Sequence, residues 1–198
     1  MRRAITHLKN ADSILARIIE RVGPYRIQYR EPDFSALARA IVFQQLHGTA
    51  ARAILERVLA LAGNGRLTAP AVLRIPVRRL RAAGLSAAKA RYIRDLAQKT
   101  VAGAIRFRQL PAMSDAEVIA TLTQVKGIGV WTAHMFLIFA LRRPDVLAVG
   151  DYGVRAAVQK AYDLPHLPKP GELERIATAW HPYCSVACWY LWRSSEVK

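Results

Sequence analysis

Apolar residues recur every three or four positions along most of this chain, a spacing that predicts amphipathic helices. The pattern is clear in six segments: residues 14–22, 34–46, 50–61, 87–101, 118–125 and 130–141. Glycine and proline interrupt it at short intervals, and the period-two alternation of strands is scarce. We therefore expect an all-α fold of about ten short helices.

Polar residues suited to helix capping precede several of these segments. Asp33 and Ser86 stand directly before apolar runs, and Ser114 with Glu117 matches a capping box. The chain of 198 residues is long enough for one or two lobes with a substantial core. We expect a single unit over residues 1–198, built from two helical lobes around a cleft: residues 30–125, and residues 1–29 together with 126–198.

Charge narrows the choice of partner. The chain carries 30 Lys and Arg against 14 Asp and Glu, a net charge of +16, which favours a polyanion such as nucleic acid. A solvated basic surface and a membrane-surface protein are the alternatives.

The sequence has no long apolar run and no signal-peptide pattern at its start, so we expect a cytoplasmic protein with no membrane partner. The two cysteines provide no disulfide framework and exclude an iron–sulfur cluster held by four cysteines of this chain.

A glycine hairpin lies between two of the expected helices. Its residues Lys126, Gly127, Ile128 and Gly129 precede an apolar helix that starts near Val130. Glycine permits left-handed backbone angles, and the N–H groups at a helix start can surround a phosphate oxygen. Such contact reads the DNA backbone rather than its sequence. An ordinary tight turn between helices explains the same pattern.

Four segments together carry a more specific signal: the hairpin, Ala38–Leu46 with its paired glutamines, Gly84–Ala97, and the tryptophan-rich Trp180–Trp192. In these segments the chain resembles the helix-hairpin-helix DNA glycosylases, and within them the AlkA-type 3-methyladenine-DNA glycosylases. The resemblance covers most of the chain. It implies a compact form, because the extra N-terminal sheet domain of AlkA would not fit in a chain of this length.

The resemblance implies a monofunctional glycosylase of base excision repair. It would flip alkylated purines, 3-methyladenine and 7-methylguanine, out of double-stranded DNA that contains damaged bases and hydrolyse their N-glycosidic bond. Asp151 is then the catalytic carboxylate, since such cleavage builds positive charge on the sugar. The alternative is that Asp151 only caps its helix, and both roles can coexist. Trp131 stands where some relatives have a lysine nucleophile, so we expect water as the nucleophile and no lyase activity.

Aromatic residues are candidates for the base pocket. A cationic alkylated purine stacks well on an indole face, which suits Trp131, and Trp192 matches the family's pocket tryptophan. Tyr152 is a further candidate. For Trp180, Trp189 and Tyr190 we prefer core packing.

Other roles are also implied by the resemblance. The hairpin with Thr132 would contact the DNA backbone, and Gln44, Gln45 or His47 would fill the gap left by the flipped nucleotide. A surface helix terminus is the plain alternative for these three residues. A monovalent cation could lie between the hairpin carbonyls and a phosphate; we expect no other cofactor, no metal bound by side chains, and a monomer.

One rival cluster would bind a metal through His181, Cys184 and Cys188, with distant His166 as a fourth ligand. Small buried cysteines are the preferred interpretation. The chain also departs from the family: Ala148 replaces the usual proline before Asp151, and Cys184 replaces a common arginine. These departures bear on substrate range more than on reaction type.

Three other functions stay open. A related glycosylase could act on deaminated or oxidised bases, although its pocket would need polar groups aimed at a neutral base. A non-catalytic helix-hairpin-helix module would bind DNA structure and use Asp151 only as a cap. A basic RNA-binding protein fits least, since we find no single-strand stacking motif.

Overall fold

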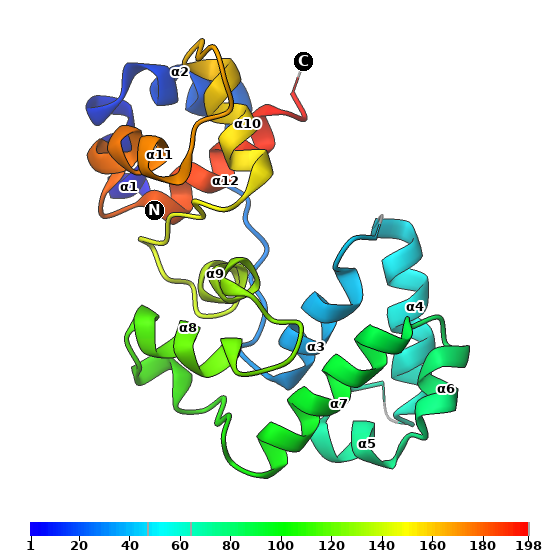
Figure 1. Cartoon of the computed structure of the whole chain (residues 1–198). Helices are drawn as coiled ribbons and strands as arrows, with labels where there is room; N and C mark the ends of the chain where they lie inside the picture. Colours follow the sequence, from blue (N-terminus) through cyan, green and yellow to red (C-terminus); the bar gives the residue numbers. More distant parts are fainter. Residues whose placement is uncertain (47, 64, 198) are drawn as a thin grey trace. The chain divides into compact units, whose positions relative to one another are not determined.

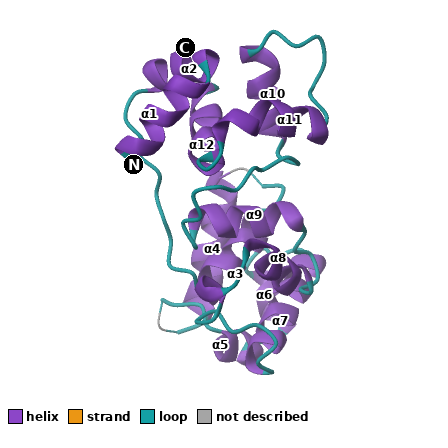
Figure 2. Cartoon of the chain, turned by 90° about the vertical axis from the view of Figure 1, so that its left-hand side faces the viewer, coloured by secondary structure: helices purple, strands orange, loops and turns teal. Residues whose placement is uncertain are grey.

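The computed structural model describes residues 1–46, 48–63 and 65–197 and is all-helical over them. These residues form twelve α-helices and no strand (Figure 2). The described residues also contain two single-turn 3₁₀-helices, Leu110–Ala112 and Thr178–Trp180. The α-helices are α1 Arg2–Ala11, α2 Ser13–Val22, α3 Phe34–Phe43, α4 Gly48–Leu61, α5 Ala69–Arg74, α6 Val77–Ala82, α7 Ala87–Val101, α8 Asp115–Thr123, α9 Val130–Phe139, α10 Tyr152–Ala161, α11 Pro170–Ala177 and α12 Cys184–Ser194 (Figure 1). The predicted all-α class is confirmed.

Internal contacts divide the chain into two units. We call residues 30–141 the central unit, and residues 1–29 with 142–198 the terminal unit. The lobe boundary that we expected at residue 125 falls elsewhere, because α9 packs on α8 and α3 and so belongs to the central unit. The expectation of one unit over residues 1–198 stays a prediction.

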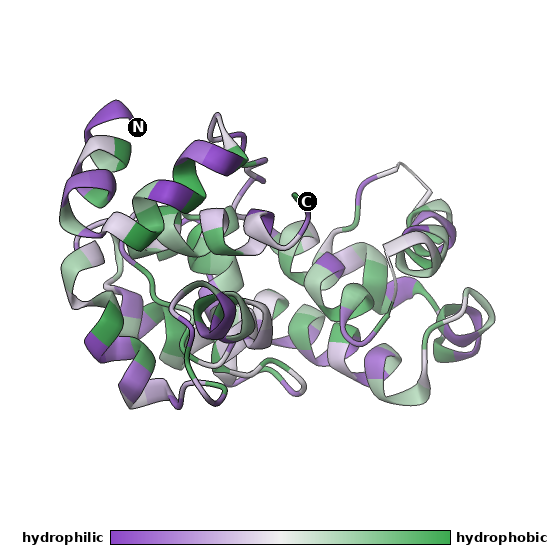
Figure 3. Cartoon of the chain, turned by 90° about the horizontal axis from the view of Figure 1, so that it is seen from above, coloured by the Kyte–Doolittle hydropathy of each residue, from purple (hydrophilic) through white to green (hydrophobic). Residues whose placement is uncertain are grey.

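The central unit is built around α7. Helices α3, α5 and α6 all pack against α7, and α4 packs against α3. Leu37, Ile41, Ile93 and Leu96 are fully buried between these helices. Apolar and polar residues share most helices, as the amphipathic pattern predicts (Figure 3).

The terminal unit is built around α12, which packs against α2 and α10. Eight consecutive residues of α12, from Cys184 to Leu191, are buried. Asp12 caps α2 and also accepts hydrogen bonds from the hydroxyl of Tyr162 and from Nε1 of Trp180, the latter at 2.9 Å. A single carboxylate therefore joins the start of α2 to two residues that lie 150 and 168 positions away in the sequence.

Capping residues start the helices as predicted. Asp33 and Ser86 accept backbone N–H groups at the starts of α3 and α7, and Ser114 with Glu117 forms the predicted capping box. The expected helix over residues 34–46 is wrong at its end, because α3 stops at Phe43 and Gln45 has a φ of 54°. Among the described residues, no helix is both long enough and apolar enough to span a membrane.

Candidate functional site

The hairpin between α8 and α9 requires glycine at one of its two glycine positions. Gly127 has a φ of 80°, and a Cβ placed there would lie 2.1 Å from Cδ2 of Tyr92. Gly129 is the N-cap of α9 with a φ of −96°, and a Cβ there would meet nothing within 4 Å. Backbone conformation and close packing onto α7 therefore both demand glycine at Gly127, and neither does at Gly129.

Asp95 on α7 anchors the hairpin. Its Oδ2 accepts the backbone N–H of Lys126 at 2.9 Å, and its Oδ1 lies 2.7 Å from Nζ of Lys99. Burial opposes ionisation of Asp95, but the hydrogen bonds from Lys99 and Lys126 outweigh it and hold the pKa of the carboxyl below its usual range. The sequence gives only one signal for Asp95, its spacing of four from Lys99, and that spacing is common on exposed helix faces.

Two of the hairpin N–H groups are already used within the protein. The N–H of Lys126 donates to Asp95, and the N–H of the buried Ile128 donates to the carbonyl oxygen of Val125 at 3.0 Å. By contrast, no side chain caps the start of α9. A phosphate oxygen is therefore best received by the first turn of α9, after Gly129.

The segment after α3 is fixed to this hairpin. Nε2 of Gln44 donates to the carbonyl oxygen of Gly127 at 2.8 Å and lies 3.5 Å from Oγ1 of Thr132. From α7, Nζ of Lys89 donates to the carbonyl oxygens of Val42 at 2.8 Å and Gln44 at 2.5 Å. Gln44, the first of the paired glutamines, is thus held against the hairpin.

One pocket of the central unit is lined by most of the residues of this unit that the sequence analysis proposed for DNA contact, for the base pocket or for filling the gap in the duplex. Gln44, Gln45, Gly127, Gly129, Trp131 and Thr132 line it, together with Lys89 and Tyr92. The structure therefore brings the glutamines to the hairpin, which sequence separation alone did not show. His47, the third candidate for filling the gap in DNA, lies outside the described residues.

Asp151 lies in the terminal unit, at the N-terminus of α10, where it is 9% exposed. Its Oδ1 accepts the backbone N–H of Val154 at 2.8 Å, so the predicted helix cap is confirmed. Nε1 of Trp192 on α12 donates to the same oxygen at 2.8 Å. The N–H of Asp151 donates to the carbonyl oxygen of Ala148 at 2.9 Å, so a hydrogen-bonded turn forms at the alanine for which the resemblance implies a proline.

Gly153 allows Asp151 and Trp192 to approach each other. A Cβ at this position would lie 3.1 Å from Oδ1 of Asp151 and 3.2 Å from Cδ1 of Trp192. A larger side chain would press on both partners of the hydrogen bond. Nothing in the sequence marked this glycine, because its role depends on Trp192, 39 residues away on α12.

The aromatic candidates differ in exposure. Trp131, in the central unit, is 45% exposed, and Tyr152, in the terminal unit, is 72% exposed. Trp192 is half-buried. Their membership of one base pocket stays a prediction. Trp180, Trp189 and Tyr190 are buried, which confirms the core packing preferred for them.

The all-helical fold and the hairpin define the class of the protein, a helix-hairpin-helix protein, and its similarity to a known family identifies that family. The family model described as "HhH-GPD superfamily base excision DNA repair protein" matches residues 38–182. The chain therefore belongs to the HhH-GPD superfamily, and the resemblance noted in the sequence is confirmed.

Close relatives of the chain are DNA-3-methyladenine glycosylases. The protein "DNA-3-methyladenine glycosylase 1" of Schizosaccharomyces pombe is 34% identical, over 98% of this chain and 88% of the relative. The solved structure of S. pombe 3-methyladenine DNA glycosylase (Mag1) in complex with abasic DNA has a TM-score of 0.89 and 34% identity, covering 98% of this chain and 97% of that one. The crystal structure of DNA-3-methyladenine glycosidase from Bacillus halodurans has a TM-score of 0.87 and 36% identity, and the match covers 97% of this chain and 88% of that one.

Proposed function

We propose that this protein is a monofunctional DNA glycosylase that hydrolyses the N-glycosidic bond of alkylated purines, 3-methyladenine and 7-methylguanine, in double-stranded DNA. The similarity to 3-methyladenine glycosylases runs over nearly the whole chain and supports this substrate class. The observation that carries the proposal is the buried carboxylate of Asp151, whose Oδ1 accepts hydrogen bonds from Val154 and Trp192. The proposed enzyme would leave an abasic site in the DNA, which is the substrate for the next step of base excision repair.

Asp151 would act on the charge that develops in the reaction. As the bond between C1′ and the purine breaks, positive charge builds on the sugar, and a fixed carboxylate beside it lowers the barrier. The same group can orient or deprotonate the attacking water. Because two donors hold the Asp151 carboxylate in place, little reorganisation is needed at the moment of reaction.

Water is the proposed nucleophile. A lyase needs an amine that attacks C1′ and forms a Schiff base, and Val130 and Trp131 follow the second glycine of this hairpin in place of such a lysine. Purines alkylated at a ring nitrogen are already cationic and leave readily. The proposed enzyme therefore needs no general acid and would not nick the strand.

DNA binding would come from the hairpin and from the charge of the chain. The uncapped first turn of α9 suits a phosphate oxygen, and a net charge of +16 favours duplex DNA in general.

Trp131, Trp192 and Tyr152 are the proposed walls of the base pocket. Since the N–H of Trp192 is bonded to Asp151, its ring face would be the part that meets the base. Gln44, Gln45 or His47 is proposed to fill the gap in the duplex. The cytoplasmic location and the monomeric state stay predictions.

The test compares the wild-type protein with Asp151→Asn on methylated duplex DNA. Asparagine caps a helix nearly as well as aspartate, so the fold should be kept while the charge is lost. We expect wild type to release 3-methyladenine and 7-methylguanine without strand nicking, and the variant to release almost none. Release by both proteins would assign Asp151 to capping alone.

Failure of both proteins to release a base, with intact duplex binding, would overturn the alkylation proposal. Duplexes that contain deaminated or oxidised bases then distinguish the remaining possibilities. Release from those duplexes would indicate the related glycosylase, and binding alone would indicate a non-catalytic module. The circular dichroism of both proteins checks that the substitution leaves the helices in place.

A further inference from the structure

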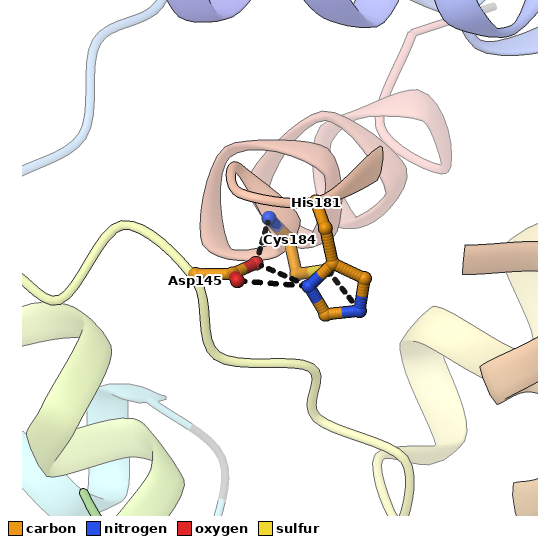
Figure 4. Close-up of side chains that lie close together, drawn as sticks. All are labelled: Asp145, His181 and Cys184. Atoms are coloured by element: carbon orange, nitrogen blue, oxygen red, sulfur yellow. Dashed lines mark hydrogen bonds and ion pairs between the residues drawn. The ribbon is translucent and has the colours of Figure 1, made fainter. Parts of the chain in front are cut away.

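Three side chains of different chemistry meet in the terminal unit, separately from Asp151. Asp145 lies in the segment between α9 and α10, His181 stands three residues before α12, and Cys184 is the first residue of α12 (Figure 4). One potential ligand atom from each of them lies within 4.8 Å of the other two. The proposed glycosylase function assigns no chemical role to these three side chains.

The contacts within the cluster are short. The two carboxylate oxygens of Asp145 lie 2.8 and 2.9 Å from Nδ1 of His181. Sγ of Cys184 lies 3.6 Å from the same Nδ1 and 3.8 Å from Nε2. The backbone N–H of Cys184 donates to Oδ1 of Asp145 at 3.2 Å, which ties the two segments together. The geometry is therefore already close to that of a ligand set.

The chemistry of the three groups suits zinc. Thiolate, imidazole and carboxylate are the ligand types that zinc takes in proteins, at about 2.3, 2.0 and 2.0–2.2 Å, in tetrahedral geometry. Those bond lengths imply ligand atoms roughly 3.3–3.6 Å apart. The sulfur–nitrogen distance of 3.6 Å already agrees, and the Asp145–His181 pair must open by about half an ångström. Rotation of the His181 ring, whose side chain is 53% exposed, allows that change.

The same groups are poorly arranged for nucleophilic catalysis. A Cys–His–Asp triad places the thiol on one ring nitrogen and the carboxylate on the other. Here the carboxylate of Asp145 is bonded to Nδ1 of His181, and the sulfur is also nearest to Nδ1. Burial, and then the neighbouring carboxylate of Asp145, raise the pKa of the Cys184 thiol, which disfavours the thiolate that a nucleophile would need. A bound metal ion can displace the proton of such a thiol.

Both cysteines are buried, as the preferred interpretation of the sequence predicts, and the rival metal cluster with Cys188 as its third ligand is wrong in that residue. Cys188 is fully buried, and its Sγ lies 4.0 Å from the carbonyl oxygen of Val146. His166, the distant fourth candidate, contacts Glu172 at 3.3 Å. Neither residue belongs to the cluster. Asp145, 36 residues before His181, completes the set instead.

We propose that Asp145, His181 and Cys184 bind one zinc ion, with water in the fourth position. The ion would join the segment after α9 to the start of α12. Asp151 follows Asp145 by six residues in that segment, and Trp192 stands on α12. The site would thus brace the two elements that hold the proposed catalytic carboxylate. Exposed His181 and half-buried Asp145 provide the path of entry.

Cobalt(II) and zinc titrations of the full chain, freed of metal with a chelator, test the proposal. We expect one cobalt ion per chain, with intense tetrahedral visible bands and a thiolate-to-cobalt charge-transfer band that zinc abolishes. Zinc should also raise the melting temperature. The absence of a charge-transfer band in the wild-type protein overturns the proposal.

Matched variants locate the site. His181→Ala removes an exposed ligand and should weaken binding by at least about tenfold, whereas His166→Ala removes another exposed histidine and should leave it unchanged. Cys184→Ser should abolish the charge-transfer band, and Cys188→Ser should keep it. Equal binding by the two histidine variants, or a charge-transfer band retained in Cys184→Ser, contradicts the assignment. Because His181 is exposed, its variant tests the site even if a cysteine variant fails to fold.

Discussion

The indole N–H of Trp192 donates to Oδ1 of Asp151 at 2.8 Å, the same oxygen that accepts the N–H of Val154 at 2.8 Å. This bond joins α12 to the start of α10. It places Trp192 beside the proposed catalytic group, where the sequence had suggested only a wall of the base pocket. Trp192 is therefore a positioning residue for Asp151 as well as a candidate for stacking.

Trp192→Phe should slow base release while keeping an aromatic ring in place. The substitution removes one of the two donors that hold the Asp151 carboxylate. A hydrogen bond to a charged group contributes about 1.5–3 kcal/mol, which corresponds to a roughly ten- to hundredfold lower single-turnover rate if the bond matters fully in the transition state. Excision from a duplex with one alkylated base measures this rate.

Trp180→Phe is the matched control for that experiment. Trp180 also donates its indole N–H to an aspartate, Asp12, at 2.9 Å, and it is fully buried. Its loss should lower the melting temperature and leave the excision rate of the folded protein unchanged. If both variants slow excision equally, the effect of Trp192→Phe is a general loss of structure.

Gly127→Ala should disrupt the hairpin. The new Cβ would lie 2.1 Å from the ring of Tyr92, at a residue with a φ of 80°. Strain and steric overlap together should cost about 2 kcal/mol or more of the free energy of unfolding and weaken duplex binding. Thermal melting and the Kd for duplex DNA measure the two effects.

Gly129→Ala tests whether that effect is specific to position 127. A Cβ at Gly129 would meet open space at a φ of −96°, so we expect a loss of at most about 1 kcal/mol, as for a weaker helix cap. Equal damage from the two substitutions would contradict the role of Tyr92 packing.

Local patterns predicted most of the helices, because periodicity and capping are local. The capping box of Ser114 and the start of α9 after Gly129 are read from a few neighbouring residues. The early end of α3 at Phe43 could not be predicted in this way. The segment that follows is held by Lys89 and by the carbonyl oxygen of Gly127, which lie 45 and 83 residues from Gln44.

In the candidate site, too, the sequence predicts the features that depend on neighbouring residues and misses those that depend on distant ones. The sequence predicted the helix start at Asp151 and the glycine hairpin, since both are local signals, whereas the catalytic role of Asp151 is implied by the resemblance and stays a proposal. It missed Asp95, Lys89 and Gly153, whose partners lie on other helices. Lysine and aspartate are ordinary residues on an exposed helix face. Only the packing of α7 against the hairpin and the segment after α3 gives them a role.

Trp131→Ala should impair recognition of the base and leave the fold intact. Trp131 is 45% exposed on the first turn of α9, so truncation removes little core packing. Loss of the stacking surface for a cationic purine should reduce kcat/KM for alkylated bases by about fivefold to thirtyfold, from a cation–π contribution of about 1–2 kcal/mol. Its neighbour Val130, 52% exposed, provides the control. The Val130→Ala variant should release alkylated bases at the wild-type rate. If Val130→Ala and Trp131→Ala lower kcat/KM equally, the cause is damage to the start of α9 and not the loss of the stacking surface.

Asp12 should make the stability of the protein depend on acid pH. Burial opposes its ionisation, but hydrogen bonds from Trp180 and Tyr162 and from two backbone N–H groups outweigh it and keep its pKa below the unfolded value of 3.8. A carboxyl with a depressed pKa in the folded state contributes stability above its unfolded pKa and loses that contribution as pH falls through the folded pKa.

Asp12→Asn isolates this effect from the other acidic groups. Asparagine still caps α2, so the variant should fold and be less stable than wild type at neutral pH. The difference in the free energy of unfolding should stay constant down to the region of pH 3.8 and shrink at lower pH, because the wild-type carboxyl is then protonated as well. Urea unfolding of both proteins from pH 7 downwards measures the difference. Asp95 and Asp145 titrate in both proteins and cancel, so a gap that stays constant to the lowest pH would show that Asp12 is not the group responsible.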